Sequence, residues 1–170
     1  MTLNNPVCEA LQELMEKYPK EIWAEASKLL LQTDRITRDR FESLMRFEHR
    51  SHLSAGLLYD VPAEVYLDWV RKDPSRRAFP VLKWLPLITE AVDGSLSWHP
   101  ALEAFIAEFG DAERVLEGLS ARFLPHSWCG SIVPHLEPIV PLLEKWTSHP
   151  LPSVRQWASR QITGMNERLD

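Results

Sequence analysis

The chain has 170 residues, of which 45% are hydrophobic and 25% are charged, and its formal net charge at pH 7 is -5. This balance is typical of a globular protein with a core of its own and excludes a chain that is disordered throughout. No apolar run approaches the ~20 residues that a membrane-spanning helix needs, and residues 1–7 have neither the basic start nor the apolar stretch of a signal peptide, so we expect a cytoplasmic protein.

Apolar residues recur at helical spacing through the first half of the chain, and the alternation typical of strands is almost absent. In chain order, the spacing predicts helices over residues 7–18, 22–30, 37–57, 63–72 and 75–91. Asp34 or Thr37 is a suitable N-cap for the third of these helices. Pro80 and Pro86 fall inside the fifth, which predicts a break or a kink in it.

The second half of the chain has a more regular pattern. Here the spacing predicts helices over residues 98–109, 111–123, 134–147 and 151–169. Pro100 lies in a first helical turn, where its missing N–H has no effect. Gly110 ends that helix and Asp111 caps the next. Pro138 and Pro141 fall inside the helix over 134–147, which predicts a bend or a late start.

These elements predict an all-α fold of antiparallel helical hairpins joined by short turns. Prolines recur at spacings of 26, 25 and 25 residues, at Pro74, Pro100, Pro125 and Pro150. The rhythm is that of one helix and one turn, whereas HEAT repeats run ~40 residues per pair. We favour a short, stacked HEAT-like α-solenoid over a closed bundle. We expect one domain over residues 1–170, with less regular helices over 1–92 and HEAT-like hairpins over 98–169.

The last third of the chain contains the most specific pattern. Phe123 precedes a Ser127-Trp128-x-Gly130-Ser131 loop, and His149-Pro150 precedes Val154-Arg155-x-Trp157-Ala158 on an amphipathic stretch. Over residues 98–169 this pattern resembles the C-terminal HEAT-like region of large bacterial multidomain proteins of the antiphage-defence type. The resemblance implies a non-catalytic scaffold or sensor that binds a protein, because the chemistry of such proteins lies in other domains. The sequence has no Gly-x4-Gly-Lys-Ser/Thr phosphate loop, so we expect no NTPase activity from it.

Charge is unevenly distributed along the chain. Residues 1–85 contain 13 basic and 13 acidic residues, whereas residues 86–170 contain 6 basic and 11 acidic residues. An acidic surface repels a phosphate backbone, since nucleic-acid affinity depends on cations that displace counterions. We therefore expect a protein partner, basic or mixed in charge, rather than a nucleic acid, and the oligomeric state stays open.

One basic cluster surrounds the predicted turn at residues 73–74. Its members are Arg71, Lys72, Arg76, Arg77 and Lys83. The cluster is either a solvated turn that Asp68 and Asp73 offset, or a docking patch for an acidic protein or a phosphate group.

Two further residues are candidates for partner binding. Trp128, in a loop, is either wedged between helices or offered to a partner as an anchor. Arg155 is expected to pair with an acidic group or a carbonyl of the neighbouring repeat, and the alternative is contact with a ligand. Trp157, on the next turn, is expected in the core.

Other chemistries lack the residues that they need. His126, Cys129 and His135 have no second close pair of ligands, which a structural zinc site normally shows. Cys129 beside a histidine lacks an orienting carboxylate and an oxyanion hole. His49 and His52, one helical turn apart, have no third ligand nearby. We therefore predict no catalytic residue, no metal and no cofactor.

These observations favour a protein-interaction module over two rivals. A small regulatory inhibitor, such as an immunity-type protein, would use the acidic half to bind one target tightly. A HEAT-like DNA glycosylase would need aromatic residues and an Asp on a basic concave face, and the acidic second half argues against it.

Overall fold

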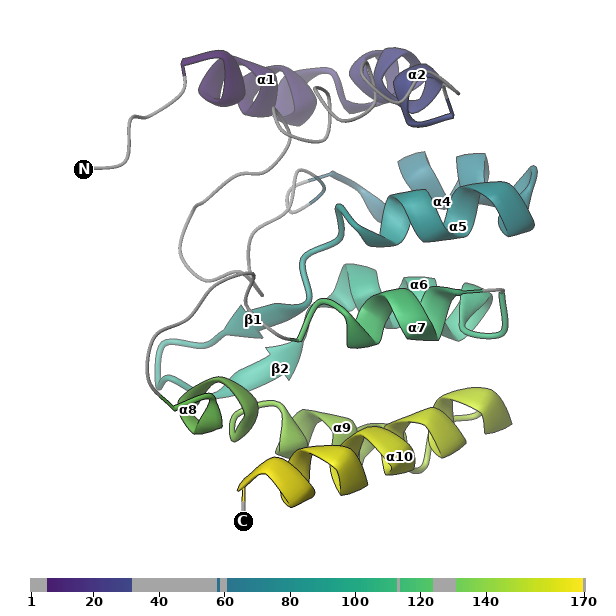
Figure 1. Cartoon of the computed structure of the whole chain (residues 1–170). Helices are drawn as coiled ribbons and strands as arrows, with labels where there is room; N and C mark the ends of the chain where they lie inside the picture. The colour runs from purple at the N-terminus through teal and green to yellow at the C-terminus, as the bar shows by residue number, and fades with distance from the viewer. Residues whose placement is uncertain (1–5, 32–57, 59–60, 113, 124–130, 170) are drawn as a thin grey trace. The chain divides into compact units, whose positions relative to one another are not determined.

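The computed structural model describes residues 6–31, 58, 61–112, 114–123 and 131–169 (Figure 1). Most of these residues lie in helices, with one two-stranded sheet among them, so the prediction of an all-α fold is confirmed. Contacts divide the chain into two compact units, Met1–Pro86 and Leu87–Asp170. The single domain over 1–170 stays a prediction, and the helix predicted over 37–57 lies outside the described residues.

The first unit contains helices that pack on their neighbours in sequence. They are α1 (Pro6–Lys17), α2 (Pro19–Leu30), α4 (Ala63–Arg71) and α5 (Pro74–Leu82). α1 packs on α2, α2 on α4, and α4 on α5. Pro19 and Pro74 each occupy the first helical turn, where a fixed φ favours the helix and the N–H has no helical partner in any case. The helix starts predicted near these prolines are therefore close to those observed.

The core of the first unit is built around aromatic rings. Trp23 of α2 lies edge-on to Tyr66 and Trp69 of α4, with ring centroids 6.3 and 5.6 Å apart. Trp23 and Tyr66 are buried, and so are the following apolar side chains of this unit: Met15, Leu30, Leu67, Val70, Val81, Leu82 and Leu85. This packing holds α4 and α5 in place and so fixes the turn between them.

The helix predicted over residues 75–91 is wrong beyond Leu82. α5 continues through Pro80 and ends at Leu82. The chain then forms strands β1 (Ile88–Glu90) and β2 (Leu96–Trp98), which pair antiparallel. The prediction that strands are almost absent therefore missed one hairpin.

Two local signals explain the hairpin. Pro86 cannot donate to a helix and disfavours helical geometry in the residue before it. Further on, Gly94 has a φ of 81°, a conformation that favours glycine, and the Asp93 carboxylate accepts a hydrogen bond from the Ser95 N–H at 2.9 Å. An Asp-Gly turn of this kind is a strong hairpin signal.

The second unit contains the hairpin and helices α6 (Pro100–Phe109), α7 (Val115–Ser120), α8 (Val133–Leu136), α9 (Val140–Trp146) and α10 (Pro152–Leu169). α10 packs on α7, α8 and α9, and α9 contacts β2 (Figure 1). The helix predicted over 134–147 is interrupted between α8 and α9, at the residues around Pro138, where its prolines predicted a bend or a late start. α10 begins one residue after its predicted start.

The predicted cap of α7 is wrong. Arg114, with a φ of 66°, precedes this helix and makes no side-chain capping hydrogen bond. Asp111 instead accepts a hydrogen bond from the Ser153 hydroxyl of α10. Its carboxylate therefore links the segment between α6 and α7 to α10 and does not cap α7.

A cluster of four buried aromatic side chains forms the centre of the second unit. Trp98 of β2 stacks on Trp146 of α9 at 4.3 Å between centroids. Trp157 of α10 lies 6.0 Å from Trp146 and 5.8 Å from Phe123. The Trp98 indole also donates to the Leu142 carbonyl at 2.9 Å, so the cluster ties the hairpin to α9 and α10. The prediction that Trp157 lies in the core is confirmed.

Candidate functional site

The basic cluster surrounds the turn between α4 and α5. Lys72 ends α4, and Asp73 is the N-cap of α5. The Asp73 carboxylate accepts hydrogen bonds from the Arg76 N–H at 3.4 Å and from the Ser75 hydroxyl at 2.9 Å. Because the first N–H groups of a helix have no partner within it, this cap fixes where α5 begins.

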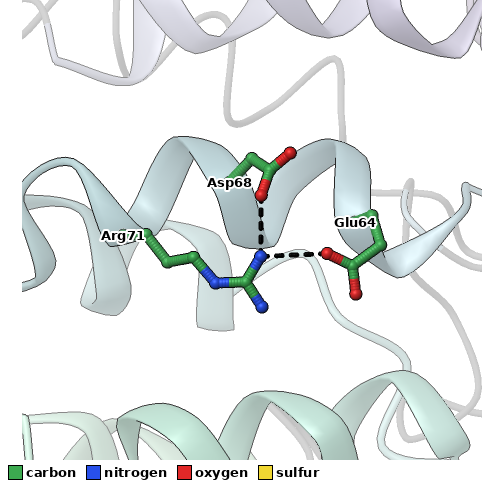
Figure 2. Close-up of polar contacts among 3 residues, drawn as sticks. All are labelled: Glu64, Asp68 and Arg71. Atoms are coloured by element: carbon green, nitrogen blue, oxygen red, sulfur yellow. Dashed lines mark hydrogen bonds and ion pairs between the residues drawn. The ribbon is translucent and has the colours of Figure 1, made fainter.

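Arg71 is held by two acidic side chains of its own helix (Figure 2). Its Nη1 lies 2.7 Å from the Asp68 carboxylate and 2.9 Å from the Glu64 carboxylate. These side chains are exposed, so each pair contributes only about 0.2–1 kcal/mol. The arrangement nevertheless gives Arg71 a structural role, and Asp68 offsets it as the sequence predicted.

Arg77 is also bound to the fold. Its guanidinium carbon lies 4.7 Å from the centroid of the Trp69 ring, and its Nη1 donates to the Trp69 carbonyl at 2.9 Å. Arg77 is half-buried, and it connects the first turn of α5 to the last turns of α4. Lys83 has a similar contact, with its ammonium 5.4 Å from the Phe79 ring centroid.

Lys72 and Arg76 differ from these three cations. Both are exposed, and neither forms an ion pair with a residue that the structure describes. They lie on opposite sides of Asp73, at the end of one helix and the start of the next. Among the residues that the structure describes, these two cations therefore have none of the ion pairs and ring contacts that hold their neighbours.

The helix dipole has opposite effects on Lys72 and Arg76. A helix has partial negative charge at its C-terminus and partial positive charge at its N-terminus. Lys72 follows α4, where a cation is favourable, but Arg76 lies in the first turn of α5, which contains no acidic residue. Arg76 is the third helical residue after an Asp cap, the position that Glu or Gln occupies in a capping box. The stability of α5 therefore does not explain the positive charge of Arg76.

Arg155 has a structural role in the second unit. Its Nη1 donates to the carbonyls of His149 and Pro150, both at 2.8 Å. The predicted contact with a carbonyl is present, but the carbonyls belong to the turn before its own helix rather than to a neighbouring repeat. His149 in turn accepts a hydrogen bond from the Leu151 N–H at 3.1 Å, so the start of α10 is fixed by local contacts.

Trp128 lies outside the described residues, as do His126, Cys129, His49 and His52. Within the described ranges, no group of three or more His, Cys, Asp and Glu side chains is placed to hold a metal ion. None of the described helices is long and apolar enough to span a membrane.

No family model, no curated protein and no solved structure matches the chain. The residues of the α4–α5 turn are therefore the basis on which we infer the function of the chain. The sequence identified this cluster but could not show which of its cations the fold holds, because the contact of Arg77 with Trp69 forms across the turn. The sequence contained the signal for the unfavourable position of Arg76, because this arginine is three residues after Asp73, and Asp73-Pro74 is a typical helix start.

Proposed function

We propose that the chain is a non-catalytic protein-interaction module, a scaffold or sensor, and that Lys72 and Arg76 bind an acidic segment of a protein partner whose charge is mixed. The setting in bacterial antiphage defence, and a HEAT-like stacking of the hairpins, are part of this proposal. Both follow from the resemblance of residues 98–169. The packing of helices on their neighbours in sequence, as in α1 with α2, α4 with α5 and α9 with α10, supports the stacking.

The position of Arg76 is the main observation in support of this proposal. Its charge opposes the dipole of α5, and it makes no ion pair with a described residue. Lys72, two residues before the first residue of α5, is equally exposed. Together with the partial positive charge of the helix N-terminus, the two cations form a positive surface on a rigid turn. An acidic segment would neutralise all three charges at once, and the attraction would accelerate its association.

The test compares the tagged wild-type chain with the variant Lys72→Glu, Arg76→Glu in capture of proteins from a bacterial lysate. Wild type should retain at least one protein in stoichiometric amount, and the variant should lose it. The retained protein should also dissociate at about 1 M salt, where exposed charges are screened beyond about 3 Å.

The matched control is Lys20→Glu, Lys145→Glu, which changes the net charge equally at exposed cations of α2 and α9. The control should retain the partner. Equal loss from both double variants, or retention by both, would contradict the proposal. Retention of a target by the Lys72→Glu, Arg76→Glu variant with loss on charge reversal in the acidic second unit would favour the inhibitor-type function instead.

A further inference from the structure

The outward face of α10 forms a shallow surface hollow. The residues that line it all belong to this helix: Gln156, Ser159, Arg160, Thr163, Gly164 and Glu167. The opposite face of α10 is buried in the second unit through Val154, Trp157, Ala158 and Met165. The stripe that lines the hollow is therefore presented on a helix whose other side is firmly packed.

The centre of this stripe is smooth and open. A Cβ added at Gly164 would meet nothing within 4 Å. The Thr163 hydroxyl donates to the Ser159 carbonyl at 3.1 Å, and the Ser159 hydroxyl donates to the Arg155 carbonyl at 3.0 Å. Because these hydroxyls are already bonded within the helix, another helix could approach the centre without leaving them unpaired.

Opposite charges flank the centre at equal distances. Arg160 and Glu167 are three and a half residues before and after the midpoint between Thr163 and Gly164, or about 5 Å along the axis on either side. Both are exposed, and neither forms an ion pair with any residue that the structure describes. A surface with a positive end, a small centre and a negative end is complementary to a copy of itself turned end to end.

We propose that α10 pairs with α10 of a second copy of this chain, antiparallel, about a two-fold axis between Thr163 and Gly164. The two-fold operation places Arg160 of each copy opposite Glu167 of the other. The two stripes together therefore form two identical ion pairs. Thr163 of each copy then faces Gly164 of the other, where the two backbones approach most closely. This self-association uses a different surface from the α4–α5 turn and does not depend on the proposed function.

The dimer is weak and sensitive to salt. One pair of helices buries less than the ~1,200 Å² of a standard stable interface, and both ion pairs are at exposed positions. We expect a monomer–dimer equilibrium in the micromolar to submillimolar range, which shifts to monomer at about 1 M salt, where charges are screened beyond about 3 Å.

The test uses Arg160→Glu and Glu167→Arg in sedimentation equilibrium of the full chain. In each variant alone, both contacts become like-charge pairs, and the dissociation constant should rise on the order of tenfold or more. A mixture of the two variants has two favourable pairs across the heterodimer and should dimerise as well as wild type. Recovery in the mixture would also show that both variants are folded.

Three results would overturn the proposal. A wild-type chain that stays monomeric into the submillimolar range has no such interface. A dimer that neither reversal weakens uses another surface. Weakening in each variant without recovery in the mixture would show that Arg160 and Glu167 do not face each other across the axis.

Discussion

Gly110 lies where the end of α6 meets the start of α10. A Cβ at this position would lie 2.6 Å from the Ile106 carbonyl oxygen and 2.8 Å from a methyl of Val154. Real side chains do not approach so closely, so α6 or α10 would have to shift. Glycine is needed here for close approach, since its φ of -60° is open to any residue.

Alanine at Gly110, the residue that caps the end of α6, and at Gly164, inside α10, should therefore have opposite effects. Gly110→Ala should lower the free energy of unfolding by about 1–3 kcal/mol through overpacking. Gly164→Ala, in open space within α10, should raise it by about 0.5–1 kcal/mol through helix propensity. Urea unfolding at low protein concentration measures both. A stabilised Gly110→Ala would show that α6 and α10 are not in contact there.

His149 makes the second unit sensitive to acid. Desolvation by burial and then the Arg155 guanidinium lower its pKa, and the Asp111 and Glu103 carboxylates oppose this. With a lowered pKa in the folded chain, the unfolded chain binds the proton more readily. The stability from His149 is therefore complete above its unfolded pKa of about 6.5 and is lost as pH falls below it.

His149→Asn should remove this pH dependence while keeping the capping of α10, since the Asn side-chain oxygen can accept from the Leu151 N–H as the imidazole does. Between pH 7.5 and 5.5, thermal unfolding of wild type should lose more stability than that of the variant. Equal losses in the two proteins would show that His149 contributes nothing to the acid sensitivity.

At the scale of elements, Trp98 joins the hairpin to the helices of the second unit. It is buried, stacks on Trp146 and donates to the Leu142 carbonyl at 2.9 Å. Trp98→Phe keeps an aromatic ring but removes the donor and part of the stacking area, and should cost about 1–3 kcal/mol. Urea unfolding followed by near-ultraviolet circular dichroism measures this cost. An unchanged unfolding midpoint would mean that the hairpin is not held by this contact.

The elements differ in how much of them could be predicted from sequence. Some helices, such as α5, α6 and α10, begin on a proline, which is a local start signal that the sequence shows directly. The starts of these helices were predicted within about two residues. The strands over 88–90 and 96–98 have three residues each, too few for alternation to outweigh the apolar helical pattern before them. The Asp93-Gly94 turn was the signal that could have corrected the assignment.

The candidate site was predictable as a cluster of charges but not as a set of contacts. The spacing of Asp68 and Arg71 within one helix indicated their ion pair, because residues three apart share a face. The stacking of Arg77 on Trp69 required the turn geometry that brings α5 against α4. The charge complementarity between two copies of α10 could be inferred only from the structure, because the structure shows which face of this helix is buried.

For the molecule as a whole, the boundary between the two units coincides with the change in charge. Residues 1–86 have equal numbers of basic and acidic residues, and residues 87–170 carry the entire net charge of -5. The exposed cations of the α4–α5 turn therefore belong to the unit with no excess of negative charge to mask them. This distribution agrees with a first unit that binds an acidic partner.

We infer that Arg76 lies at the start of α5 because it binds a partner, although its charge there destabilises the helix. The most direct test of this inference is the urea unfolding of Arg76→Glu, with Lys72→Glu as a control of opposite sign. Arg76→Glu should raise the free energy of unfolding by about 0.3–1 kcal/mol, since it suits the helix dipole and completes a capping box with Asp73. Lys72→Glu, at the end of α4, should lower it by a similar amount. A destabilised or unchanged Arg76→Glu would show that this arginine has no cost to the helix, and would contradict the inference that it is there for a partner.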